Sequence, residues 1–119
     1  MRSNPSREDA DRVQAHVEAF NAAVREGAWA HFALRFTPDA VMRFPQLPAP
    51  DAVGRTAIAA AYARQPPTDT MAAAAVRSAG DRDEVDFTWS AGGSGTMTIA
   101  WAQDLVHSLD VVFAEAPGT

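Results

Sequence analysis

The residues best suited to chemistry in this sequence are its three histidines, His16, His31 and His107. An imidazole titrates near neutral pH, so a histidine in an apolar setting can act as a general acid or base. The three are not spaced as HxH or HxxxH, and the chain has no cysteine. Disulfides, thiolate nucleophiles and cysteine-ligated metals are therefore excluded. We expect no metal ion and no other cofactor.

His107 is the preferred candidate for a catalytic residue because of its place in a strand-like segment. Side chains alternate between the two faces of a strand. In residues 105–113 this alternation puts His107 on the same inward face as Leu109 and Val111. Two interpretations stay open: an acid–base group in a pocket, or a partly solvated histidine close to the turn at 103–104.

Three further polar side chains lie where a pocket could use them. Tyr62, the only tyrosine, follows Ile58 by one helical turn, which predicts a buried ring whose hydroxyl seeks a partner. His16 and Asn21 flank the apolar stripe of the first predicted helix, at the edge of the interior. The plainer interpretation makes the tyrosine a core residue and the other two half-exposed helix residues.

The charged residues of the predicted elements favour structural roles. Alternation places Asp86 and Asp110 on the outward face of their strands, although a bulge or a one-residue shift would reverse this. Arg55, at the start of a predicted helix, is expected to form an ion pair with an acid such as Asp51 or Asp39.

The elements that must position these residues are helical in the first half of the chain. Apolar residues recur at helical spacing between Val13 and Val24, which predicts a helix from about Ser6 to Gly27. The remaining elements expected in this half are a shorter helix over 29–36, a strand over 41–44, a proline-containing loop over 45–53 and a third helix over 56–64.

The second half of the chain has the pattern of an antiparallel meander. Four strands are predicted, at 71–79, 84–90, 95–102 and 105–114, joined by tight turns. Helices followed by strands are typical of an α+β domain. We expect a single domain over 7–114, with a flexible N-terminus at 1–6 and a C-terminal tail at 115–119.

Three segments carry a resemblance to a known superfamily: FNAAVREGAW at 20–29, FTPDAV at 36–41 and GRTAI at 54–58. With the four strands that follow, they resemble the nuclear transport factor 2-like superfamily, which includes ketosteroid isomerases, limonene-epoxide hydrolases and SnoaL-type polyketide cyclases. The resemblance implies a cone-shaped α+β roll, with three N-terminal helices packed on a strongly bent, mainly antiparallel sheet around an apolar pocket. It also implies a homodimer through the outer sheet face, which is rich in Thr and Ser.

The resemblance does not extend to the usual catalytic groups. The positions that carry a tyrosine and two aspartates in ketosteroid isomerases match Phe20, Phe44 and Met97 here. The Asp–Arg–Asp set of the epoxide hydrolases has no inward-facing counterpart, since Asp86 and Asp110 point outward. Proton transfer by either known set of residues is therefore not expected.

We predict a protein that binds and transforms a small hydrophobic organic molecule in the manner of an isomerase or cyclase, with His107 and Tyr62 as catalytic residues. The expected ligand-binding residues are His16, Phe20, Asn21, Phe44, Phe87, Trp89, Met97, Trp101 and Val111. The alternative is a non-catalytic domain that binds a small ligand or dimerises around a filled core.

The charge balance excludes several other partners. Ten arginines, no lysine and 15 acidic residues give a net charge of −5, which disfavours nucleic acid and anionic membranes. No apolar run approaches the roughly 18 residues that a membrane helix needs, and the N-terminus lacks the pattern of a signal peptide. We therefore expect a cytoplasmic protein.

Overall fold

A computed structural model describes residues 7–48 and 50–114 of the chain. The expected flexible start at 1–6, including the predicted helix start at Ser6, and the expected tail at 115–119 lie outside the described residues. The helical elements are α1 (Arg7–Glu26), α2 (Trp29–Phe32), the short 3₁₀ turn η1 (Ala33–Arg35) and α3 (Arg55–Arg64). The helices lie close to the ranges that the apolar spacing predicts.

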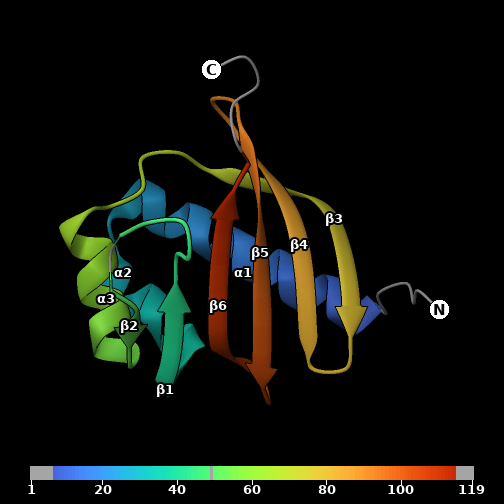
Figure 1. Cartoon of the computed structure of the whole chain (residues 1–119), viewed down its shortest axis with the longest axis horizontal. Helices are drawn as coiled ribbons and strands as arrows, with labels where there is room; N and C mark the ends of the chain where they lie inside the picture. Colours follow the sequence, from blue (N-terminus) through green and yellow to red (C-terminus); the bar gives the residue numbers. More distant parts are fainter. Residues whose placement is uncertain (1–6, 49, 115–119) are drawn as a thin grey trace.

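The strands form one sheet that the helices cover on a single face (Figure 1). The strands are β1 (Phe36–Arg43), β2 (Ala52–Val53), β3 (Met71–Ala79), β4 (Arg82–Trp89), β5 (Ser94–Ala102) and β6 (Leu105–Phe113). Their order is β2-β1-β6-β5-β4-β3, and only β1 and β6 pair in parallel. The predicted α+β roll with a mainly antiparallel sheet is confirmed.

The strand β1 begins earlier than the sequence predicts. We expected a break at 37–39, but the strand starts at Phe36 and includes Pro38. The ladder with β6 pairs Phe36 with Val106 and resumes only at Val41. Because Pro38 lies in this irregular stretch, its missing N–H is not needed for the ladder.

A β-bulge in β6 reverses the predicted orientation of His107. Ala100 pairs with Ser108, but the next residue of β5, Trp101, pairs with Val106, so His107 is the extra residue. Val106, predicted to face outward, is fully buried. The side chain of His107, predicted to face inward, is 51% exposed. The prediction for these two residues is wrong, while the inward positions of Leu109 and Val111 hold.

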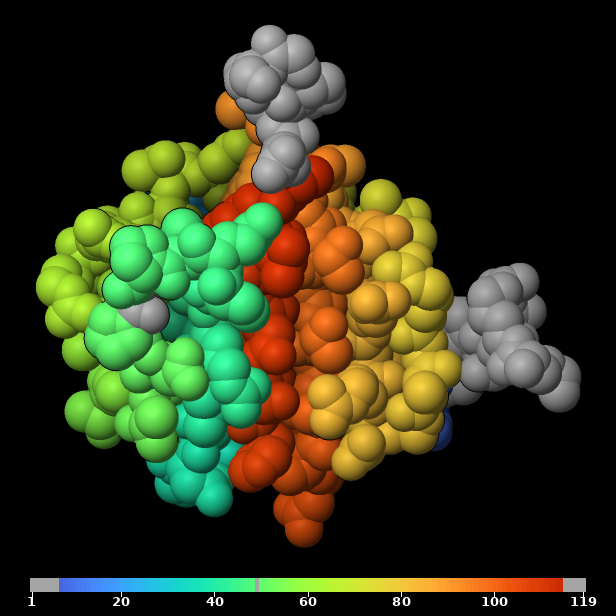
Figure 2. All heavy atoms as spheres, in the orientation of Figure 1, coloured from blue at the N-terminus to red at the C-terminus, as the bar shows by residue number. Residues whose placement is uncertain are grey.

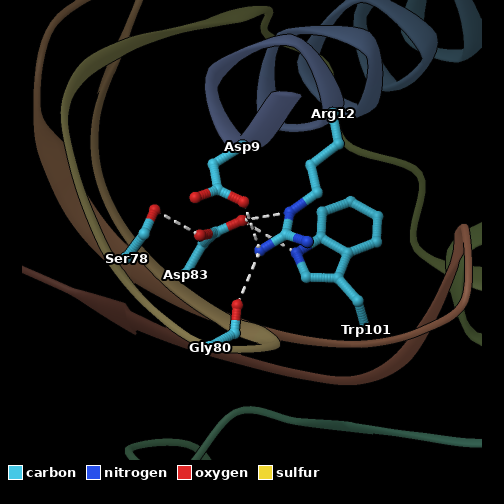
Figure 3. Close-up of polar contacts among 6 residues, drawn as sticks. All are labelled: Asp9, Arg12, Ser78, Gly80, Asp83 and Trp101. Carbon is cyan, nitrogen blue, oxygen red and sulfur yellow. Dashed lines mark hydrogen bonds and ion pairs between the residues drawn. The ribbon is translucent and has the colours of Figure 1, made fainter. Parts of the chain in front are cut away.

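The helix α1 crosses the concave face of the sheet and is held there at its first turns by a buried carboxylate (Figure 3). Asp83 of β4 is fully enclosed and accepts hydrogen bonds from Arg12 Nε and Trp101 Nε1, each at 2.8 Å. Ser78 Oγ donates to its other oxygen at 2.6 Å. Burial alone raises the pKa of Asp83, but the bonds from Arg12, Ser78 and Trp101 outweigh this and lower it. Asp83 therefore stays ionised and fully bonded.

The guanidinium of Arg12 completes this cluster on the helix side. It lies 5.1 Å from the centre of the Trp101 ring, a cation–π contact, and 3.1 Å from Asp9 one turn earlier. It also donates to the carbonyl of Gly80 at 3.4 Å, in the turn between β3 and β4. The start of α1 is thus joined to the hairpin through a single side chain (Figure 3).

The buried carboxylate predicts an unequal response of two aspartates on the same strand. Asp83→Ala leaves Arg12 and the indole N–H without their acceptor, so we expect a loss of about 3–5 kcal/mol in the free energy of unfolding. Asp86→Ala is the matched control, because Asp86 lies on the solvent-facing side of β4 and pairs with Arg77. Its loss should be far smaller. Urea denaturation followed by tryptophan fluorescence measures both, and equal losses would contradict this account.

Candidate functional site

A cavity of about 800 Å³ lies between α1, α3 and the concave face of the sheet. Eight of the predicted site residues line it: His16, Phe20, Phe44, Tyr62, Phe87, Trp89, Met97 and Val111. The large apolar lining residues that were not predicted as ligand contacts include Met42, Leu47, Met71, Leu109 and Phe113. Alternation signalled that Met42, Leu109 and Phe113 face inward, whereas Leu47 lies in a loop without any periodic pattern.

One wall of the cavity is a continuous row of aromatic rings. Phe44 stacks on Phe113 with ring centres 6.2 Å apart, and Phe113 lies 6.4 Å from Trp89. Trp89 then meets Phe87 edge-on at 5.1 Å and Phe20 of α1 at 6.2 Å. These rings pack against one another, so this wall presents a continuous apolar surface to the cavity.

The mouth of the cavity lies among loops that hydrogen bonds fasten to the strand ends. The side-chain amide of Gln46 donates to the carbonyl of Phe113 at 2.9 Å and accepts from its N–H at 2.6 Å. Across the mouth, Asp69 accepts from the backbone N–H of Ala91 at 2.8 Å. These hydrogen bonds therefore hold the rim on two sides.

His16 is buried in the cavity lining and is uncharged. Its side chain is only 1% exposed, and its ring packs against Phe32, Phe36 and Trp101. Burial, aided by the positive charge of Arg35, lowers the pKa of His16 from 6.5 to about 3. The imidazole is therefore neutral at pH 7, a weak base but an available hydrogen-bonding group.

Tyr62 lies on α3 at the cavity and is also uncharged. Its ring stacks on Trp29, with centres 4.6 Å apart and planes inclined by 11°. Burial raises the pKa of Tyr62 well above its ordinary value. The phenol therefore keeps its proton at any physiological pH and cannot act as a general base.

Two predicted ligand-binding residues, Asn21 and Trp101, have structural partners instead of a place in the cavity lining. The side chain of Asn21 donates to the carbonyl of Met71 and accepts from its N–H, both at 2.9 Å, which ties α1 to the start of β3. The indole of Trp101 is bonded to Asp83 on the far side of His16. Facing inward is thus not sufficient to reach the cavity.

His107, predicted to be catalytic, lies outside the cavity because of the bulge in β6. Its Nδ1 is 3.3 Å from the hydroxyl of Thr37 and 3.8 Å from the carboxylate of Asp39, both in β1. Arg55 also differs from expectation: its guanidinium donates to the carbonyl of Phe36 at 2.6 and 3.0 Å, not to an acid. Both residues fasten β1 to its neighbours.

The acidic residues leave the inner part of the cavity without a carboxylate. Asp86 and Asp110 face outward as predicted, where they pair with Arg77 at 2.9 Å and Arg43 at 2.8 Å. Within the described part of the chain, the carboxylates of the cavity lining are Asp51 and Asp69, both in rim loops.

Neither a metal centre nor a membrane span is found in the part of the chain that the structure describes. In residues 7–48 and 50–114, no group of three or more His, Asp or Glu side chains is placed to hold a metal ion. No helix over the same residues is long and apolar enough to cross a membrane.

Comparison with known proteins identifies the domain type. A sequence model of the SnoaL-like domain matches residues 17–113. A proposed ketosteroid isomerase from Kribbella flavida DSM 17836 has a similar structure, with 17% identity and a TM-score of 0.69 over 92% of this chain and 82% of that one. An NTF-2-like protein of unknown function from Burkholderia xenovorans LB400 is similar at 17% identity, with a TM-score of 0.67 over 92% and 90%. No curated protein sequence matches the chain.

A third solved structure is of interest for its bound molecule. It is a hypothetical protein with a ketosteroid isomerase-like fold from Catenulispora acidiphila DSM 44928, in complex with trimethylamine. Its identity to this chain is 14%, with a TM-score of 0.68 over 81% of this chain and 82% of that one. At such identities these likenesses establish the shared fold.

The buried neutral histidine predicts a loss of stability in mild acid. The unfolded chain binds a proton at His16 below pH 6.5 and the folded chain only near pH 3, so stability falls as the pH drops through this window, by up to about 1.4 kcal/mol per pH unit. Two charged groups nearby, Arg12 and Asp83, stay ionised from pH 6.5 to 4.5, because the pKa of Arg12 is raised and that of Asp83 is lowered.

His16→Phe places an apolar ring among aromatic neighbours and removes this titration. Its free energy of unfolding should be nearly flat between pH 6.5 and 4.5, whereas that of the native chain falls. Urea titrations at several pH values measure the difference. His107→Phe is the control, since His107 is half exposed. If the His16 variant keeps the full slope, the assignment of a neutral imidazole is wrong.

Proposed function

The chain belongs to the SnoaL-like domain family, and from this premise we propose that its cavity binds a small, uncharged, hydrophobic organic molecule. The observation that carries the proposal is the open cavity of about 800 Å³ with its aromatic wall. Ligand sites of small molecules have volumes of roughly 300–1,000 Å³ and apolar linings with a few polar groups. A core filled by side chains, the alternative considered from the sequence, leaves only voids near the size of a water molecule.

The lack of inner charge supports an uncharged ligand. The inner polar groups are neutral His16 and protonated Tyr62. A charged ligand group placed there would lose its hydration without an ionic partner, at a large cost in free energy. Among the described residues, the charged side chains of the cavity lining itself are Asp51, Arg64 and Asp69, while Arg35 acts on His16 from outside the lining.

Isomerase-like or cyclase-like conversion of the bound molecule is a second candidate function. It is supported by the fold shared with a proposed ketosteroid isomerase and by the two buried groups that can donate hydrogen bonds, His16 and Tyr62. Donors aimed at developing negative charge stabilise a transition state without proton transfer. This form of catalysis needs no internal carboxylate, in keeping with the apolar residues Phe20, Phe44 and Met97 in the lining.

We also propose that two copies of the chain associate through the outer face of the sheet. No helix in the part of the chain that the structure describes covers this face, which Figure 2 shows across β1, β6, β5, β4 and β3. Several of its charges are paired within the chain, Arg77 with Asp86 and Glu84, and Arg43 with Asp110. Paired charges and short side chains are compatible with a flat protein–protein contact.

Filling the cavity is expected to abolish ligand binding. Val111→Trp adds an indole to the cavity, whereas Val112→Trp adds the same group on the outer face of the same strand. A neutral fluorescent probe such as N-phenyl-1-naphthylamine should bind the native chain and the Val112 variant with similar affinity. The Val111 variant should bind at least ten-fold more weakly while keeping its far-UV circular dichroism. Equal binding by both variants would refute the cavity as the site.

An arginine in the middle of the outer face should prevent dimerisation. Thr98 lies on β5 between Glu84 and Asp110 of the neighbouring strands, so the monomer accommodates Thr98→Arg without strain. Light scattering should give about twice 12.7 kDa for the native chain and about 12.7 kDa for the variant. Ala63→Arg, exposed on α3, is the control and should remain dimeric. A native monomer, or a dimeric Thr98 variant, would contradict the proposed interface.

A further inference from the structure

Two enclosed nitrogen atoms in the interior have no hydrogen-bond partner within the chain. They are Nδ1 of His16 and Nε of Arg35, the two buried side-chain polar atoms that stay unpaired among residues 7–48 and 50–114. Buried polar groups in folded proteins are nearly always paired, because an unpaired one costs about 1–3 kcal/mol. We therefore expect both nitrogens to bind a partner that does not belong to the chain.

Arg35 belongs to the segment that surrounds the imidazole of His16. The ring centres of Phe32 and Phe36 lie 5.4 and 6.1 Å from that of His16. Arg35 directly precedes Phe36 and follows Phe32 by three residues, a spacing that aligns two side chains on a 3₁₀ turn. After burial, the positive charge of Arg35 is the second cause that lowers the pKa of His16 to about 3. The two unpaired nitrogens thus belong to neighbouring side chains.

The groups around these nitrogens are unsuited or already bonded. Phe32 and Phe36 have no polar atom in their side chains. The indole N–H of Trp101, whose ring meets the imidazole edge-on at 6.4 Å, donates to Asp83 at 2.8 Å (Figure 3). The carbonyl of Phe36 already accepts two hydrogen bonds from Arg55. A small bridging molecule can satisfy both nitrogens where these groups do not.

We propose that His16 and Arg35 hold one internal water molecule between them, which accepts a hydrogen bond from Nε–H of Arg35 and donates one to Nδ1 of His16. Internal waters typically make about three hydrogen bonds to groups that would otherwise be unpaired, and they are costly to remove. Two of these bonds come from the two unpaired nitrogens. The site lies on the enclosed side of the imidazole, so it does not depend on what the cavity binds.

The chemistry of the two nitrogens favours water over an anion. Nε of Arg35 is always a donor, so its partner must accept. Nδ1 of a neutral imidazole can accept, and water is able to accept from one group and donate to the other. A chloride ion only accepts, and in this enclosed place it would lose its hydration with a single positive group to compensate.

The water fixes the tautomer of His16 and makes Arg35 a positioning residue for the cavity lining. A hydrogen bond donated to Nδ1 leaves the ring proton on Nε2. His16 is one of the lining residues, whereas Arg35 is not. Arg35 thus acts on the cavity through the orientation and the protonation of another side chain.

A high-resolution crystal structure of the native chain tests the proposal directly. An ordered water should lie within hydrogen-bonding distance of Nδ1 of His16 and of Nε of Arg35 at once. Crystals grown in sodium bromide distinguish an anion from water, because bromide gives an anomalous signal. A bromide peak there, a direct bond between the two nitrogens, or no density between them would each overturn the proposal. ¹⁵N-histidine NMR should show the Nε2–H tautomer of His16, and the opposite tautomer would contradict the donated bond.

A double-mutant cycle tests in solution whether the two side chains share a partner. Arg35→Met removes Nε–H and keeps an unbranched apolar side chain. At pH 7 it should raise the equilibrium constant of unfolding about 5- to 10-fold in the native chain, the range expected for one hydrogen bond. In His16→Phe, where the water has lost its second partner, it should raise the constant by less than two-fold.

Arg25→Met is the control for this cycle, because Arg25 is an exposed arginine near the end of α1. Its effect on the equilibrium constant of unfolding should be the same in the native chain and in His16→Phe. Urea denaturation measures all of these constants. An effect of Arg35→Met that is equal in the two backgrounds would show that the side chains do not share a water, and would overturn the proposal.

Discussion

The position of α1 across the concave face of the sheet is the constraint on which the cavity depends. Two polar anchors fix it: Arg12 bonds to the buried carboxylate of Asp83, and Asn21 pairs with both backbone groups of Met71. Each joins the helix to β3 or β4 by contacts of definite geometry, which apolar packing alone does not supply. Between these anchors, His16 and Phe20 can only face the interior.

As a result, one end of the interior is closed and contains a buried ion pair, whereas the other end is open and mainly apolar. At the start of α1, Asp83 is enclosed with its three donors, and the space is closed. At the other end the sheet closes on loops, where Gln46 and Asp69 hold the rim to the strands. The buried ion pair of Asp83 and Arg12 thus stabilises the closed end, while the lining towards the open end is mainly apolar. Such an arrangement suits a hydrophobic ligand.

The periodic parts of the structure were predictable, and the irregular parts were not. The apolar spacing of Val13, Val17 and Phe20 predicts α1, and the alternation of Val85 and Phe87 predicts the face of β4. The bulge that turns His107 outward follows from pairing with β5 and β1, and a one-residue change of that kind leaves no mark in the alternation itself.

The rim loops and the hydrogen-bond partner of Trp101 could not be predicted from the sequence, for related reasons. The rim residues lie in segments without a period, so Leu47 and Gln46 gave no signal, although a Gln46 side chain can replace a backbone pairing at a strand end. The inward direction of Trp101 was predictable, but its bond to Asp83 was not, because Asp83 lies just before the strand predicted at 84–90, where no alternation indicates which way its side chain points. Tertiary contacts decide which inward residues meet the cavity.

The shift from His107 to His16 changes the kind of chemistry that the interior supports. A half-exposed histidine beside Asp39 is suited to carry a proton, whereas a buried neutral imidazole is suited to donate a hydrogen bond. Because Phe20, Phe44 and Met97 are apolar, the cavity lining has no charged side chain at these three positions that would hold water inside the cavity. If the cavity binds a ligand as proposed, we expect a lining of this composition to discriminate between ligands by shape and by hydrogen bonding. The free energy of a hydrogen bond formed in the cavity depends on how well the aromatic wall excludes water, because a hydrogen bond is stronger where water does not compete for it.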